Sequence, residues 1–157
     1  MTLVLGLGSP DRGDDGAGPA VVDQVRALRL PGVRVRVVGD PSRLLEAWSG
    51  EPDVVVVDAV RADDEPAGTV LAIELGRHVR TPAPMPTGSG GTHTLGLTDA
   101  VRLARALDAL PRRLLVVGIV GRTFTLGAGL SDPVRAAVES AAAVVASRGG
   151  SRADAGR

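Results

Sequence analysis

Three carboxylates stand in a glycine-rich turn near the start of the chain. The segment GSPDRGDDGAG, residues 8–18, holds Asp11, Asp14 and Asp15, and it follows the apolar run LVLGL at residues 3–7. Such a turn before a helix commonly binds phosphate, but a P-loop has Lys and Ser or Thr where this chain has Asp14 and Asp15. Two carboxylates about 4 Å apart already repel by roughly 1 kcal/mol in bulk water. We therefore expect the turn to bind a cation or to act in acid–base chemistry, with one of the two adjacent aspartates capping the helix.

Two further groups could take part in the same chemistry. Asp58 ends the apolar run VVVV, and His93 stands in GGTHTLGL before a predicted helix. Burying an unpaired carboxylate costs several kcal/mol, so Asp58 needs a partner, either a backbone N–H or a cation. The positive N-terminus of a helix disfavours imidazolium, which keeps His93 neutral and able to bind metal. Two carboxylates and one imidazole would suit a divalent first-row metal and would leave coordination positions open.

Alternating apolar runs and helical patterns predict the elements that must position these groups. Strands are predicted at residues 2–8, 33–38, 53–60, 68–75 and 113–121. Helices are predicted at about residues 19–30 and at 42–48, the second with Ser42 as cap. A third helix of about 14 residues is predicted within 93–110, with one side formed by Leu97, Val101, Ala104 and Leu107 or Asp108. A fourth is predicted to begin from a cap at Ser131 or Asp132.

This order predicts an α/β fold built as a three-layer sandwich, with a twisted, mostly parallel sheet and helices on both faces. Residues 68–75 are expected to form an antiparallel edge strand, and residues 76–92 a long loop. Residues 1–147 are expected to form a single domain, and residues 148–157 a disordered tail. Since ligands bind beyond the carboxyl ends of parallel strands, Asp15, Asp58 and His93 are expected to share one edge of the sheet.

Composition excludes several classes of chemistry. The chain has 157 residues with no Cys and no Tyr, and all of its 18 basic residues are Arg, which excludes thiolate sites, disulfides and Schiff-base lysines. Because 18 acidic residues balance the charge, nothing indicates nucleic-acid or anionic-membrane partners. No apolar stretch approaches the roughly 20 residues of a membrane span, and no signal peptide is evident, so a cytoplasmic protein is expected.

Four motifs, in order and at fitting intervals, resemble those of the hydrogenase maturation proteases. These nickel-dependent endopeptidases process the large subunits of [NiFe]-hydrogenases. The resemblance covers about residues 2–147 and rests on LVLGLGSPDRGDDGAG, VVVVDAV, GTHTLGL and VVGIV. It departs from the usual first motif, G-x-G-N, at Ser9 and Pro10, and Gly91 stands where the third motif often has Ser.

The resemblance implies that Asp15, Asp58 and His93 bind metal, with Asp15 and Asp58 as the catalytic candidates. The partner would be a large-subunit precursor with its nickel already inserted, from which a short C-terminal extension is removed. Nickel would then arrive with the substrate, although other divalent metals could occupy the site. Asp14 and Asp40 are expected to help frame the cleft, and nothing requires more than a monomer.

The chemistry of peptide hydrolysis stays open between three routes. Nickel could polarise the carbonyl or activate a water, Asp15 or Asp58 could act as general base, or two carboxylates could share a proton as a dyad.

Three other functions compete with the protease hypothesis. A serine hydrolase could use Ser89 in TGSGG with His93 and Asp58, but this segment lacks the strand and the spacing of a nucleophile elbow. A non-catalytic nickel-dependent checkpoint or chaperone could bind the same precursor through the same three ligands. A nucleotide-binding module is the third alternative, and the carboxylates in the turn disfavour it.

Overall fold

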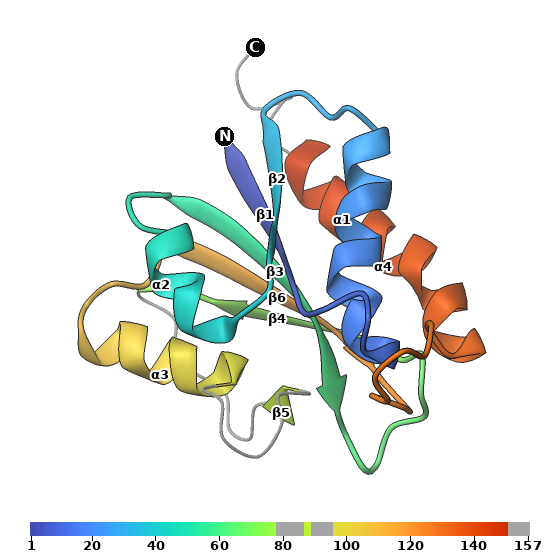
Figure 1. Ribbon diagram of the computed structural model, residues 1–157. Coiled ribbons are helices and arrows are strands. Elements are labelled where there is room, and N and C mark those ends of the chain that lie inside the picture. The colour runs from blue at the N-terminus through green and yellow to red at the C-terminus, as the bar shows by residue number, and fades with distance from the viewer. Residues whose placement is uncertain (78–86, 89–95, 151–157) are drawn as a thin grey trace.

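The computed structural model describes residues 1–77, 87–88 and 96–150. The twisted sheet has six strands, five of which follow one another in the order β2-β1-β3-β6-β4 (Figure 1). β1, β2, β3 and β6 are parallel, whereas β4 pairs antiparallel with β6 at one edge. The predicted mostly parallel sheet with one antiparallel edge strand is therefore confirmed. The bounds are β1 Thr2–Leu7, β2 Val33–Val38, β3 Asp53–Arg61, β4 Val70–Leu75 and β6 Arg113–Val120.

Helices cover both faces of the sheet, which confirms the three layers. α1, Ala17–Ala27, and α4, Asp132–Gly150, pack together on one face, while α2, Leu44–Ala47, and α3, Leu97–Ala106, lie on the other (Figure 1). Two short 3-10 turns, η1 at Gly13–Gly16 and η2 at Pro41–Arg43, lead into α1 and α2. A two-residue strand, β5 at Thr87–Gly88, pairs antiparallel with the end of β3, within the segment that the sequence predicted as loop.

Alternation along the strands produces two separate cores. Val55 and Val57 of β3 belong to the core under α1 and α4, whereas Val54 and Val56 belong to the core under α2 and α3. Successive side chains of a strand point to opposite faces, so an all-valine run supplies both cores at once. This is why VVVV, without polar alternation, forms a central strand covered on both sides.

Three details of the predicted helices are wrong. α1 starts earlier, after η1, and ends at Ala27 because Arg29 adopts a positive φ of 49°. Asp40, not Ser42, caps the turn into α2, since its Oδ1 accepts the Ser42 N–H at 2.9 Å. α3 has ten residues, and Leu107 beyond its end is 62% exposed, because the chain turns away through Asp108 at a φ of 52°.

The predicted tail begins too early. α4 continues to Gly150, and the guanidinium of Arg148 lies 2.9 Å from the buried carboxylate of Asp53 at the start of β3. Arg148 also forms an ion pair with Glu74 on β4. A disordered segment from residue 148 is therefore wrong for residues 148–150, while residues 151–157 lie outside the described part of the chain.

Candidate active site

Close backbone packing places the acidic turn directly on the ends of the central strands. A Cβ atom at Gly18 would lie 2.4 Å from the carbonyl oxygen of Leu7 and 2.6 Å from that of Val57, so only glycine fits this contact of α1 with β1 and β3. Gly8 has a φ of 125°, and a Cβ there would lie 2.0 Å from the carbonyl oxygen of Asp15. These two glycines therefore bring the backbone of Asp15 to the carboxyl ends of β1 and β3.

Asp15 is partly exposed and is oriented by the turn itself. Its Oδ2 accepts the backbone N–H of Ser9 at 2.8 Å. This bond uses only the backbone N–H of Ser9, so any residue other than proline can donate it. The departure from the G-x-G-N pattern at Ser9 therefore leaves this means of orienting Asp15 in place.

Asp58 is buried beside Asp15. Its side chain is 3% exposed, and it stands in β3 opposite Gly118 of β6. Burial raises the pKa of Asp58 well above its usual range, and the negative charge of Asp15 raises it further, against a hydrogen bond from the Ala59 N–H that lowers it. The charge of Asp15 thus acts on Asp58, as expected for two carboxylates near one edge of the sheet. A cation placed between them would favour the ionised form of both carboxylates.

Asp14 has a structural role, although it is the neighbour of Asp15. It is 0% exposed, and its oxygens accept the N–H groups of Arg122, Thr123 and Ser131 at 2.7, 3.1 and 2.7 Å and the Ser131 hydroxyl at 2.8 Å. Burial alone would raise the pKa of Asp14, but the hydrogen bonds from Arg122, Ser131 and Thr123 lower it below its usual value. The prediction that Asp14 lines a cleft is therefore wrong.

The expectation that one of the two aspartates caps the helix is also wrong. Arg12 and Gly16, at the N-caps of η1 and α1, make no side-chain capping bond. Asp14 instead fastens the turn to residues 121–131, and further backbone bonds join the two segments, from Gly13 to Ala128 at 2.9 Å and from Asp14 to Thr123 at 2.7 Å. Sequence reasoning assigned Ser131 only as a possible cap of α4, and no local signal links it to a residue so distant in the chain.

Asp40 lies at the carboxyl end of β2 with its side chain exposed. The N–H of Ser42 lowers the pKa of Asp40, with a smaller contribution from the charge of Arg43. Its participation in a cleft stays a prediction.

His93 and Ser89 lie outside the described residues, so their relation to Asp15 and Asp58 stays a prediction as well. Within residues 1–77, 87–88 and 96–150, no three His, Cys, Asp or Glu side chains are grouped closely enough to hold a metal ion. The metal site expected from Asp15, Asp58 and His93 therefore stays a prediction.

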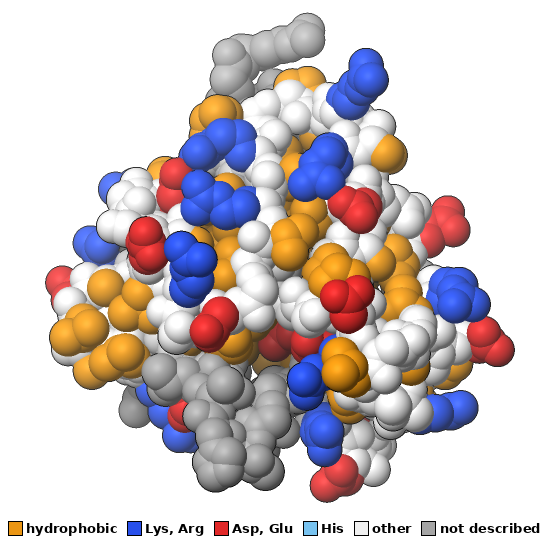
Figure 2. All heavy atoms as spheres, viewed as in Figure 1, with side chains coloured by type: hydrophobic (Ala, Val, Ile, Leu, Met, Phe, Trp, Pro, Cys, Tyr) orange, Lys and Arg blue, Asp and Glu red, His pale blue; other side chains and the backbone are white. Residues whose placement is uncertain are grey.

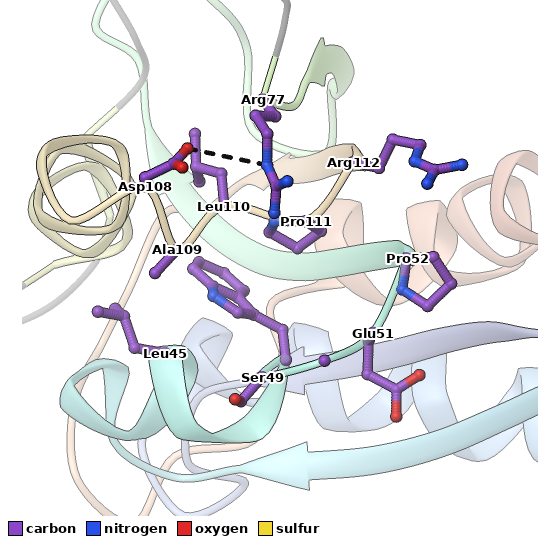
Figure 3. A pocket seen from close by; sticks show the side chains of 12 residues that line it. Leu45, Ser49, Glu51, Pro52, Arg77, Asp108, Ala109, Leu110, Pro111 and Arg112 are labelled. Atoms are coloured by element: carbon purple, nitrogen blue, oxygen red, sulfur yellow. Dashed lines mark ion pairs between the residues drawn. The ribbon is translucent and has the colours of Figure 1, made fainter.

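A cavity of about 360 Å³ lies at the opposite, amino-terminal edge of the sheet. Figure 3 shows Arg77 and Asp108 approaching each other across it, with their ion pair at 3.8 Å. Trp48 also lines this cavity, and its buried indole N–H has no hydrogen-bond partner among the described residues. β3 runs from this edge, at Asp53, to the edge that holds Asp58, so the cavity is separate from the carboxylate pair.

Comparison with known proteins identifies the family. The family model for hydrogenase maturation protease matches residues 39–148. The chain belongs to the hydrogenase maturation protease family. It is thus a hydrolase of the endopeptidase type, in a family that acts on precursors of hydrogenase large subunits.

Individual hydrogenase maturation proteins show the same relationship. The chain is 32% identical to the hydrogenase expression/formation protein HupM of Azotobacter chroococcum over 146 residues, covering 90% of this chain and 68% of that protein. It is 25% identical to the hydrogenase 2 maturation protease of Escherichia coli K12, covering 88% and 84%. The structure of the [NiFe] hydrogenase maturation protease HybD from Thermococcus kodakarensis superposes with a TM-score of 0.71 at 29% identity, covering 92% and 96%.

The helices of the described residues include none with the length and apolar character needed to cross a membrane.

Proposed function

We propose that this protein removes a short C-terminal extension from the nickel-loaded precursor of a [NiFe]-hydrogenase large subunit. In this proposal Asp15, Asp58 and His93 recognise the nickel that the substrate carries. The observation that supports it best is the coupling of Asp58 to Asp15, because a buried carboxylate next to a second one is costly without a cation.

The different environments of the two carboxylates suggest different roles. Asp15 is partly exposed and is held by the Ser9 N–H, so it can meet an incoming metal centre first. Asp58 is buried and holds a proton more readily than an ordinary carboxyl group, so metal binding would release that proton. Asp58 could then accept a proton from the attacking water or remain a ligand, and both possibilities require its ionised form.

The decisive experiment is the intact mass of the nickel-loaded precursor from the same source after incubation with wild type, Asp15→Asn and Asp11→Asn. Asp11 is an exposed aspartate of the same turn and serves as the matched control. We expect wild type and Asp11→Asn to release a C-terminal peptide, and Asp15→Asn to release none. A nickel-free precursor should stay intact with all three proteins.

An unchanged precursor mass with wild type, in a sample shown to contain nickel, would contradict the proteolytic role for that partner. Nickel-dependent co-elution of protease and precursor without cleavage would instead support the checkpoint or chaperone alternative.

A further inference from the structure

A groove lies between the edge strand β2 and the short helix α2, at the carboxyl end of β2. It encloses about 390 Å³. Basic side chains gather on this face beside β2 and α2 (Figure 2). The groove is lined by Arg36, Val37, Val38 and Gly39 from the end of β2, and by Arg43, Glu46 and Ala47 from η2 and α2.

Two arginines from different elements face this groove and form no ion pair within the described residues, although the charge of Arg43 acts on the exposed carboxylate of Asp40. Within the described residues, no carboxylate oxygen lies within 4.0 Å of Arg36 or Arg43, whereas Arg34 on the same strand binds Glu51 at 2.6 Å. Charged side chains on an edge strand often have no other role than to prevent edge-to-edge aggregation. That role would account for Arg34 and Arg36. It does not account for Arg43, which reaches the same groove from η2. The lining residues carry two positive charges, on Arg36 and Arg43, and one negative charge, on Glu46, while the carboxylate of Asp40 follows Gly39 in the chain and interacts with Arg43.

The edge of β2 can accept an extended peptide. β2 has β1 on one side and no described strand on the other, so its outer backbone groups are open to pairing. Val37, in the groove, is 40% exposed. A peptide added here would combine main-chain hydrogen bonds with contacts to the two arginines.

The groove faces the same side of the sheet as the carboxylate site. Val38 of β2 and Val56 of β3 belong to the same core. Side chains two residues apart on a strand point to the same face, so Arg36, two residues before Val38, and Asp58, two residues after Val56, both project to that face. Leu7 pairs with Val38, and the pairing of Gly6 with Val57 places Leu7 level with Asp58. Two strand spacings, about 10 Å, separate β2 from β3, and Arg36 lies roughly 7 Å further back along its strand. At about 3.3 Å per residue, an extended peptide spans this distance in roughly three to five residues.

We propose that this groove binds an acidic side chain of the precursor's C-terminal extension, about three to five residues after the cleaved bond. The segment lies along the outer edge of β2, and its carboxylate contacts Arg36 and Arg43. This inference rests on the function proposed above and adds to it a contact that selects the extension by charge. The groove holds the segment that is removed, while Asp15 and Asp58 meet the metal centre that remains.

The test measures processing kinetics with the nickel-loaded precursor and three proteins: wild type, the double variant Arg36→Gln/Arg43→Gln, and Arg34→Gln. Arg34 is the matched control, since it lies on the same face of β2 but outside the groove. We expect the double variant to raise KM roughly tenfold, about 1.4 kcal/mol, with kcat within about twofold of wild type. Arg34→Gln should leave both values unchanged. In a second precursor, Asp and Glu in the first five residues of the extension are replaced by Asn and Gln. This precursor should raise KM for wild type but not for the double variant.

Each other result overturns a defined part of the inference. An unchanged KM in the double variant excludes the groove as a docking site, and an equal rise with Arg34→Gln reduces it to general electrostatics. Normal processing of the neutralised precursor excludes recognition of an acidic side chain. If KM rises only when the C-terminal carboxylate of the extension is amidated, the arginines contact the chain end instead. Failure of wild type to cut the nickel-loaded precursor is a separate outcome, which contradicts the proposed function itself.

Discussion

Asp14 and Asp15 are chemically identical neighbours, and we expect their conversion to Asn to have opposite consequences. Asp14→Asn should destabilise the protein strongly, whereas Asp15→Asn should abolish processing with little effect on stability. The reason is that Asp14 accepts four hydrogen bonds inside the protein, while the turn fixes Asp15 through the Ser9 N–H at a partly exposed position.

The size of the Asp14 effect follows from its bonds. Oδ2 accepts from Arg122, Thr123 and the Ser131 hydroxyl, whereas Oδ1 accepts only from the Ser131 N–H. In Asn the oxygen can keep the first three partners, so the amide NH₂ would face the Ser131 N–H and leave that donor unsatisfied. An unsatisfied buried donor costs about 1–3 kcal/mol, and the three remaining bonds lose the assistance of a full charge. We therefore expect a loss of about 3 kcal/mol for Asp14→Asn and less than about 1 kcal/mol for Asp15→Asn.

The assay is urea unfolding of the metal-free proteins followed by tryptophan fluorescence. Trp48 is the single tryptophan and is 1% exposed, so its emission reports loss of the core under α2 and α3. With a slope of about 2 kcal/mol per M, the midpoint should fall by about 1.5 M for Asp14→Asn. Asp11→Asn should unfold like wild type. Equal midpoints for Asp14→Asn and wild type, or an equal loss in Asp15→Asn, would refute the structural role assigned to Asp14.

Three further predictions follow from the buried charges and the metal. Burial and the charge of Asp15 raise the pKa of Asp58 in the folded protein. Above the pKa that this carboxyl group has in the unfolded chain, the ionised Asp58 therefore lowers the free energy of unfolding. Asp58→Asn should consequently unfold at a higher urea concentration than wild type at neutral pH, while losing processing. For Asp53, burial alone would raise the pKa, but hydrogen bonds from Thr2 and Arg148 lower it. Its stabilisation is therefore present above about pH 4 and lost below it, and Asp53→Asn should flatten the acid limb of a stability–pH curve. Stripping nickel from the precursor should stop cleavage, and a mass spectrum after reloading nickel should show it restored.

Local patterns accounted for the sheet, and distant contacts produced the errors. The run VVVV needs no partner to be recognised as a buried strand, and the Asp that ends it is thereby placed at the carboxyl edge. In contrast, Asp14 and Asp15 have the same local sequence context, and only the donors at residues 122–131 distinguish them. Arg148 looked like part of a polar tail because its partner, Asp53, lies in a strand far away in the chain.

The bonds of Asp14 also set an order of events during synthesis. The residues that hold it, Arg122 and Ser131, are 108 and 117 positions later in the chain. The ribosome must therefore translate most of this domain before the turn carrying Asp15 can take its final shape. Until residues 122–131 have been synthesised, the acidic turn of a nascent chain lacks the donors that secure it.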